Sequence, residues 1–207
     1  NRRMKLHLAG DFHARGHHLH GFHIKDYKEQ CEKLISKSDF IIFHGSLSQI
    51  ELRELFEKTN VSISLSTYHD EDYGMSLAQA LQFGHRLIVS NWGGHGNYIE
   101  HFDVESIPVA IENRVPRLDL LSFEKSLAEL QIPNEEDMLK QIERASDYFS
   151  LSKFRNELNR ISEGKWKRFE NISSFYEDYL DLAEEHYPFH RLQEIDYYTP
   201  IYQHYLK

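Results

Sequence analysis

Cysteine is nearly absent from this chain, which narrows both its chemistry and its environment. Cys31 is the single thiol among 207 residues, so no intramolecular disulfide can form, and a reducing, cytoplasmic location is expected. Long hydrophobic runs are absent too, since no apolar stretch approaches the roughly 18 residues of a membrane-spanning helix. The first residues lead straight into a strand pattern rather than into a signal peptide. We therefore expect a soluble domain.

Basic residues are also in short supply. The chain has 24 Lys and Arg against 33 Asp and Glu, a formal net charge of −9. Nucleic-acid phosphates are held by basic patches, so this balance argues against a nucleic-acid partner. A chain of 207 residues can bury one good core and carry a helical appendage. Composition thus argues against a membrane-spanning protein and a nucleic-acid-binding protein. The function itself has to be inferred from local motifs.

Fourteen histidines suggest a metal site, above all those between His13 and His23. Zinc sites combine histidines with cysteines or with carboxylates at regular spacing, and neither accompanies this group. We therefore expect no metal. Cys31 falls on the apolar face of a helical pattern and is expected to be an inert core residue.

Strand and helix patterns alternate over residues 1–132. Strands are predicted at residues 4–9, 40–43, 61–65, 87–90 and 107–111, and helices at 27–36, 48–58, 74–83 and 122–130. Strands that alternate with helices of about ten residues indicate α/β architecture with a doubly wound, parallel, Rossmann-like sheet. Ligands bind beyond the carboxyl ends of the strands in such sheets.

Residues 133–207 are charged and helical in pattern, and we expect a helical extension that packs on the first domain. Asn134 and Ser152 are expected to cap two of its helices. A last helix beginning at Trp166 carries an aromatic stripe. That stripe is expected to be core packing, or in part to face a separate N-terminal domain.

Residues 66–84 (STYHDEDYGMSLAQALQFG) are the most informative stretch. They follow a buried-strand pattern, carry three consecutive acids, turn at Gly74 and enter an apolar helical pattern that stops at Gly84. The free N–H groups and positive dipole end of a helix attract phosphate, and carboxylates accept hydrogen bonds from sugar hydroxyls. This order of elements favours a site for a phosphate-bearing, hydroxyl-rich ligand. The alternative is a solvated loop.

Three motifs in this order resemble the group 1 glycosyltransferases, which are retaining enzymes of the GT-B fold that use nucleotide sugars. The family signature has two glutamates, and here Glu71 stands at the first position and Gln79 where the second is expected. Residues 87–94 (LIVSNWGG) resemble the next strand and its Gly-Gly loop, and residues 4–10 and 41–47 resemble the preceding strands. The similarity covers residues 4 to about 130.

The resemblance implies the C-terminal, donor-binding half of such an enzyme, which transfers a hexose from a nucleoside diphosphate sugar without a metal cofactor. It implies that Glu71 is the catalytic residue at the donor sugar and that Gln79 lies at the ribose. The other donor-binding positions that it implies are Gly10, Gly45, Ser46, Leu47, Gly74, Met75, Ser76, Gly93 and Gly94. Gly10 and the Gly93-Gly94 pair have simple turns as their alternative reading.

Two parts of the family pattern are not evident in the sequence: the first Rossmann-like domain and the basic pair that neutralises the diphosphate. We therefore expect a C-terminal piece of a longer protein, inactive alone, whose acceptor domain lies in the same or another chain. Any peripheral membrane contact would have to come through the missing part. A non-catalytic nucleotide-sugar-binding module or subunit is the main alternative. An unrelated flavodoxin-like protein is the weakest, because it has no reason to combine Glu71 with the Gly-Gly loop.

Overall fold

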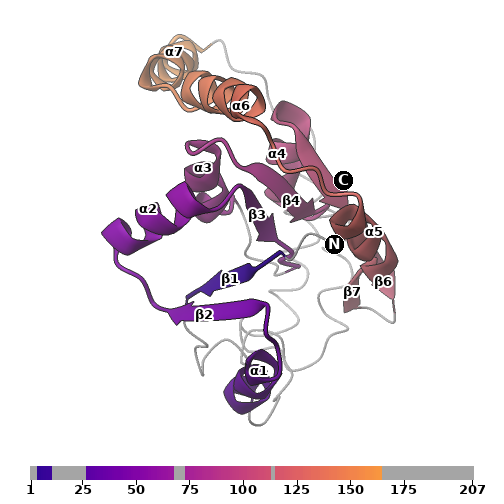
Figure 1. Ribbon diagram of the computed structural model, residues 1–207. Coiled ribbons are helices and arrows are strands. Elements are labelled where there is room, and N and C mark those ends of the chain that lie inside the picture. The colour runs from indigo at the N-terminus through magenta and orange to yellow at the C-terminus, as the bar shows by residue number, and fades with distance from the viewer. Residues whose placement is uncertain (1–3, 11–26, 68–72, 113–114, 165–207) are drawn as a thin grey trace.

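The computed structural model describes residues 4–10, 27–67, 73–112 and 115–164 of the chain. The strands in these ranges are β1 (Leu6–Ala9), β2 (Ile41–Gly45), β3 (Val61–Ser64), β4 (Arg86–Ser90), β5 (Val104–Ile107), β6 (Val109–Glu112) and β7 (Val115–Leu118). The helices are α1 (Tyr27–Ser36), α2 (Gln49–Lys58), α3 (Met75–Leu81), α4 (His95–His101), α5 (Leu120–Ala128), α6 (Glu135–Tyr148) and α7 (Leu151–Ser162). Strands and helices alternate from β1 to β5 (Figure 1).

The strands from β1 to β5 are parallel wherever they pair. β1 pairs with β2, and β3, β4 and β5 form a three-stranded sheet in that order. The parallel α/β architecture expected from the sequence is therefore confirmed. Within the described residues the two groups of strands remain separate ladders, and the β1–β2 ladder shifts register between Leu8 and Ala9.

The hydrophobic core surrounds β4. Its residues Leu87, Ile88 and Val89 are fully buried, as expected for a central parallel strand covered on both faces. The helices α3, α4 and α6, with the residue that follows α4, supply the rest of the cluster: Leu77, Ala78, Ala80, Leu81, Tyr98, Phe102 and Ala145. Phe40 and Phe43, beside and within β2, are by contrast exposed. The best-packed part of the described chain is thus the β3–β5 sheet and the helices on it.

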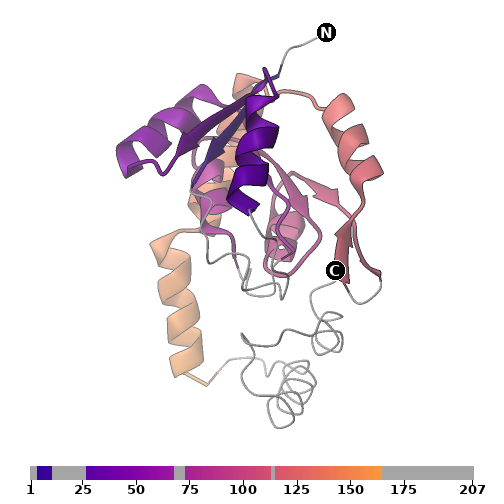
Figure 2. The same cartoon turned by 90° about the horizontal axis from the view of Figure 1, so that it is seen from below.

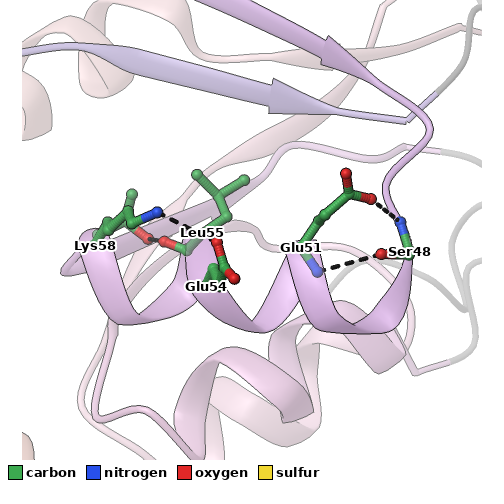
Figure 3. Close-up of polar contacts among 6 residues, drawn as sticks. Ser48, Glu51, Glu54, Leu55 and Lys58 are labelled. Atoms are coloured by element: carbon green, nitrogen blue, oxygen red, sulfur yellow. Dashed lines mark hydrogen bonds and ion pairs between the residues drawn. The ribbon is translucent and has the colours of Figure 1, made fainter.

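α2 begins with the capping box predicted from Ser48 and Glu51, shown in Figure 3. The Ser48 hydroxyl accepts a hydrogen bond from the Glu51 N–H at 3.3 Å, and the Ser48 N–H donates to the Glu51 carboxylate at 2.8 Å. Hydrogen bonds that the Glu51 carboxylate accepts from Ser48, from its side chain first and its backbone second, lower the pKa of Glu51. Lys58 closes the helix with an ion pair to Glu54 at 3.5 Å. The box satisfies two groups that a helix start otherwise leaves unpaired.

α6 packs directly on the turn that follows α3. Gly84 has φ +76°, and a Cβ at this position would lie 2.6 Å from the Met138 carbonyl oxygen. The Gln141 amide then donates to the backbone carbonyls of His85 at 3.5 Å and Asp103 at 3.4 Å. A glycine is required here both for the left-handed backbone and for the close approach of α6.

Two sequence predictions are wrong in detail. The strand expected at residues 107–111 is split by Pro108, which has no N–H for a ladder, and β6 turns away to pair antiparallel with β7. Ser150, not Ser152, caps α7, since its side chain accepts from the Lys153 N–H at 3.3 Å. Asn134 caps α6 as predicted, accepting from the Asp137 N–H at 2.9 Å. The helix predicted from Trp166 lies outside the described residues.

Figures 1 and 2 show α7 projecting away from the sheets. Its apolar side chains Leu151, Phe154, Leu158 and Ile161 are all exposed. Among the helices in the described ranges, none is long and apolar enough to cross a membrane.

Candidate functional site

The loops after β3 and β4 open at the same edge of the three-stranded sheet. The strands are parallel and in register, with Ser64 at the end of β3 opposite Val89 in β4. The first loop leads to Gly74 and α3, and the second leads to Gly93, Gly94 and α4. The two glycine motifs singled out in the sequence therefore meet at one carboxyl edge, where parallel α/β sheets bind their ligands.

A buried histidine links the ends of the two strands. His95, the first residue of α4, is fully buried, and its Nδ1 lies 2.9 Å from the Ser90 hydroxyl. Its Nε2 lies 3.3 Å from the Ser64 hydroxyl. The Ser90 hydroxyl also donates to the Ser66 carbonyl oxygen at 2.5 Å. The start of the loop after β3 is thus held by the end of β4.

The hydrogen bonds determine which nitrogen of His95 carries a proton. A carbonyl oxygen only accepts, so the one proton of the Ser90 hydroxyl goes to Ser66. Ser90 can then only accept from His95, which makes Nδ1 the protonated nitrogen. In the neutral ring Nε2 is the acceptor, and the Ser64 hydroxyl donates to it. The cluster is a directed chain from Ser64 through His95 and Ser90 to the Ser66 backbone.

The start of α3 is a second feature of this edge. Gly74 is its N-cap in the left-handed conformation, φ 63° and ψ 64°, and no side chain caps the helix. Met75 and Ser76, the first two helical residues, are exposed. First-turn N–H groups have no intrahelical acceptor, so those of Met75 and Ser76 face outward from the helix start.

Tyr98 ties α4 to this helix start. Its buried hydroxyl donates to the Gly74 carbonyl oxygen at 3.2 Å, and its ring lies 5.1 Å from that of Tyr73. Burial first, and the neighbouring Tyr148 second, raise the pKa of Tyr73 to about 12. The two tyrosines fix the segment at which the acidic loop rejoins the fold. Glu71 itself lies outside the described residues, as do its neighbours Asp70 and Asp72.

Gln79 lines a cavity of about 440 Å³ between α2 and α3. The stacked rings of Phe56 and Phe83, 5.4 Å apart, form part of its wall. Its other lining residues are Gln49, Leu52, Arg53 and Gln82. Arg53 is paired with Glu57 at 3.1 Å. Gly74, Gly93 and Gly94 do not line this cavity, so the structure does not bring Gln79 and the glycine loops into one pocket.

Gly10 and Gly45 come together at the end of the β1–β2 ladder. The Gly10 N–H donates to the Gly45 carbonyl oxygen at 2.8 Å, and Ser46 and Leu47 follow in the loop to α2. Within this ladder the rings of His7 and His44 stack 5.2 Å apart, with two ring nitrogens 2.9 Å from each other. Burial and the neighbouring His44 lower the pKa of His7. No hydrogen bond among the described residues joins this group to the loops at α3 and α4.

Sequence reasoning found the glycines of this edge and missed its buried polar groups. Ser64, Ser90, His95 and Tyr98 were not predicted as site residues. One signal was available, since Ser64 and Ser90 lie next to or at the ends of the predicted strands 61–65 and 87–90, and a histidine follows the Gly-Gly pair. In the described ranges no three His, Cys, Asp or Glu side chains are grouped so as to hold a metal, and residues 13–23 lie outside them.

The family of glycosyl transferases group 1 matches residues 1–112 of the chain. That region, more than half of the 207 residues, runs from β1 to the end of β6 and includes both glycine loops. No curated protein gives a significant match. On the family match, the chain belongs to the group 1 glycosyl transferases.

Proposed function

We propose that this chain is the donor-binding domain of a retaining glycosyltransferase that takes a hexose from a nucleoside diphosphate sugar. One observation carries the proposal. Gly74 and the Gly93-Gly94 turn introduce two helices at the same carboxyl edge, and the edge is held by the Ser90–His95 and Tyr98–Gly74 contacts. This arrangement suits a ligand that approaches the backbone closely and carries negative charge.

The diphosphate is the part of the donor that fits the helix starts. In this proposal the N–H groups of Met75 and Ser76 bind phosphate oxygens, and the absence of a side-chain cap on α3 leaves those donors for the ligand. The glycines at positions 93 and 94 allow the donor to lie against the main chain. The base of the nucleotide is contacted by backbone groups of Gly10, Gly45, Ser46 and Leu47.

The two positions of the family signature are assigned to the remaining parts of the donor, the transferred sugar and the ribose. Glu71 accepts hydrogen bonds from hydroxyls of the transferred sugar, and Gln79 reaches the ribose. An amide offers one carbonyl acceptor, whereas a carboxylate makes stronger, charge-assisted bonds to two neighbouring hydroxyls. Gln79 therefore binds ribose more weakly than a glutamate does.

The chemistry proposed is front-face transfer, in which the leaving diphosphate helps to deprotonate the acceptor hydroxyl. The chain then contributes positioning and electrostatic stabilisation rather than a dedicated base. The acceptor site belongs to an N-terminal domain of the same or another chain. No metal is required in this scheme.

A second candidate is a nucleotide-sugar-binding module without turnover. It is favoured by one specific observation: the described loop residues 65–67, 73–74 and 91–94 include no Arg or Lys to neutralise the diphosphate. Binding by the helix starts alone is weaker than binding supported by a cation. The two candidates share the donor site and differ in turnover.

Thermal unfolding with a panel of nucleoside diphosphates and their sugar conjugates tests the shared claim. A ligand present at about 100 times its dissociation constant adds roughly 2.7 kcal/mol of stability. We expect one nucleoside diphosphate sugar to raise the melting temperature, with the matching phosphate-free nucleoside as the inactive control. Amide NMR shifts should then appear at Met75, Ser76, Gly93 and Gly94. A panel without any stabilising member contradicts the proposal.

A further inference from the structure

A second cavity, of about 330 Å³, lies at one end of β4. The loops that carry Gly74 and Gly93-Gly94, which we call the donor loops, lie at the other end. Arg86, which begins β4, lines it, whereas Ser90, which ends β4, belongs to the donor edge. Four steps of about 3.3 Å along a strand separate the two ends by roughly 13 Å. The remaining walls come from Asp103, the segment of residues 131–134 and α6. The cavity is thus separate from the proposed donor site.

The close docking of α6 builds this cavity. The Gly84 backbone touches Met138, and the Gln141 amide N–H₂ group bridges the carbonyls of His85 and Asp103. Gln141 is only 8% exposed, and its amide oxygen accepts no hydrogen bond from the residues that the structure describes. That oxygen is not among the polar atoms sealed from solvent. A buried residue that lines a cavity therefore offers it a fixed, unused acceptor.

Three basic and two acidic side chains line the cavity, so a ligand would meet charges of both signs. Arg86 and Lys140 are paired with acids, at 3.4 Å to Glu105 and 2.6 Å to Glu136. Asp103, Asp137 and Arg144 also line the cavity, and within the described ranges none of the three side chains forms an ion pair. An anion would meet the two carboxylates, and a cation would meet the guanidinium groups. Neither kind of ion is favoured.

The unpaired groups suit a neutral ligand rich in hydroxyls. A hydroxyl donates and accepts at once, so it can bond a carboxylate and a guanidinium or amide together. Bonds to charged partners are the stronger ones, and carboxylate, amide and guanidinium groups are planar forks that match neighbouring hydroxyls. Ile132 and Pro133 add an apolar wall against which the C–H face of a sugar ring can pack. The cavity thus combines both requirements of carbohydrate binding.

We propose that this cavity binds a neutral sugar unit of a glycan, independently of the donor site. Asp103 and Asp137 accept from its hydroxyls, Arg144 donates to them, and the Gln141 amide oxygen accepts from the innermost one. The site holds a glycan at the opposite end of β4 from the donor. It does not require the donor site to be active.

The test is an NMR titration of the full chain with neutral probes: the methyl glycosides of glucose, galactose, mannose and N-acetylglucosamine, with maltose and cellobiose. We expect at least one probe to give saturable amide shifts confined to residues 84–86, 103 and 131–144. In the unsubstituted protein, nuclear Overhauser contacts between sugar C–H protons and the Ile132 methyl groups should accompany them. These contacts need no variant and so remain informative if a substitution disturbs folding.

Matched substitutions add a quantitative readout. Arg144→Ala and Asp103→Asn should each raise the dissociation constant of that probe about tenfold or more, because each removes a charge-assisted bond. Arg155→Ala, on exposed α7, is the control and should leave it unchanged. The proposal is overturned by the absence of saturable binding, by shifts only at the donor loops, or by equal affinities in the Arg144 and Arg155 variants. Preferential binding of inorganic phosphate at these residues overturns it as well.

Discussion

The Nδ1 atom of His95 lies 2.9 Å from the hydroxyl of Ser90, and this contact spans the loop that carries Gly93 and Gly94. Ser90 ends β4, and its hydroxyl donates to the Ser66 carbonyl in the loop after β3. His95 begins α4 directly after the Gly93-Gly94 turn. A shift of either loop must therefore break a buried hydrogen bond, which makes the edge a rigid platform.

Replacing Ser90 tests that platform. Ser90→Ala removes both hydrogen bonds of the Ser90 hydroxyl, to the Ser66 carbonyl and to the His95 Nδ1–H, and the loss of a buried hydrogen-bond partner costs about 1–3 kcal/mol. We expect the free energy of unfolding to fall by about 2–4 kcal/mol in urea titrations, with weaker nucleotide-sugar binding. Ser36→Ala, which removes an exposed hydrogen bond to the Lys33 carbonyl, is the control and should change stability little. Equal losses of unfolding free energy in the two variants would contradict a larger contribution from the buried contacts of Ser90.

Gly84 provides a test of the α3–α6 contact. Gly84→Ala places a Cβ 2.6 Å from the Met138 carbonyl oxygen in a left-handed backbone, whereas Gly164→Ala has a similar φ, +70°, with open space around it. Both variants should lose about 1–2 kcal/mol for the backbone. Gly84→Ala should lose more, because α6 must also move away. Comparable melting temperatures for the two variants would contradict the close packing.

The lowered pKa of His85 predicts how the free energy of unfolding depends on pH. Burial lowers the pKa of His85, although its bonds to the Phe56 and Thr59 carbonyls partly offset the effect. The unfolded chain binds a proton near the ordinary value of 6.5, while the folded chain stays neutral to lower pH. The free energy of unfolding is therefore highest above pH 6.5 and decreases as the pH falls through the lowered pKa.

Urea unfolding at a series of pH values measures this dependence. His85→Gln should flatten the decrease on the acid side, whatever its effect on stability at neutral pH. His7 has a pKa lowered in the same direction, so its own substitution should remove a further part of the slope. If His85→Gln leaves the dependence of the unfolding free energy on pH unchanged, the loss of stability in acid does not come from His85.

The sequence was most predictive where one local rule determined the structure. The Leu87–Val89 run identified the buried central strand, and the Ser48–Glu51 pair identified the start of α2. The split at Pro108 was missed because two short strands with one residue between them read as a single apolar run. The Ser64–His95–Ser90 chain was also missed, because its members come from three different elements and only the fold brings them together.

Gln79 offers a test of the ribose contact. Gln79→Glu supplies a carboxylate acceptor, which should gain something like 1 kcal/mol over an amide. Repulsion from the ligand's diphosphate opposes that gain, but it acts about equally on a ribose nucleotide and on its deoxy analogue. The ratio of the two affinities is therefore the quantity to measure, and the substitution should raise it in favour of ribose. An unchanged ratio would mean that residue 79 does not contact the ribose.

Donor-sugar binding at the acidic loop is the central claim, and calorimetry with Glu71→Ala tests it most directly. If Glu71 contacts the transferred sugar, the variant should bind the nucleoside diphosphate sugar more weakly by roughly 1.5–3 kcal/mol. It should bind the bare nucleoside diphosphate almost as the parent does. Asp70→Ala makes the same charge change one residue away and controls for long-range electrostatics. Equal losses for the two ligands, or equal effects of the two substitutions, would contradict the assignment of Glu71 to the donor sugar.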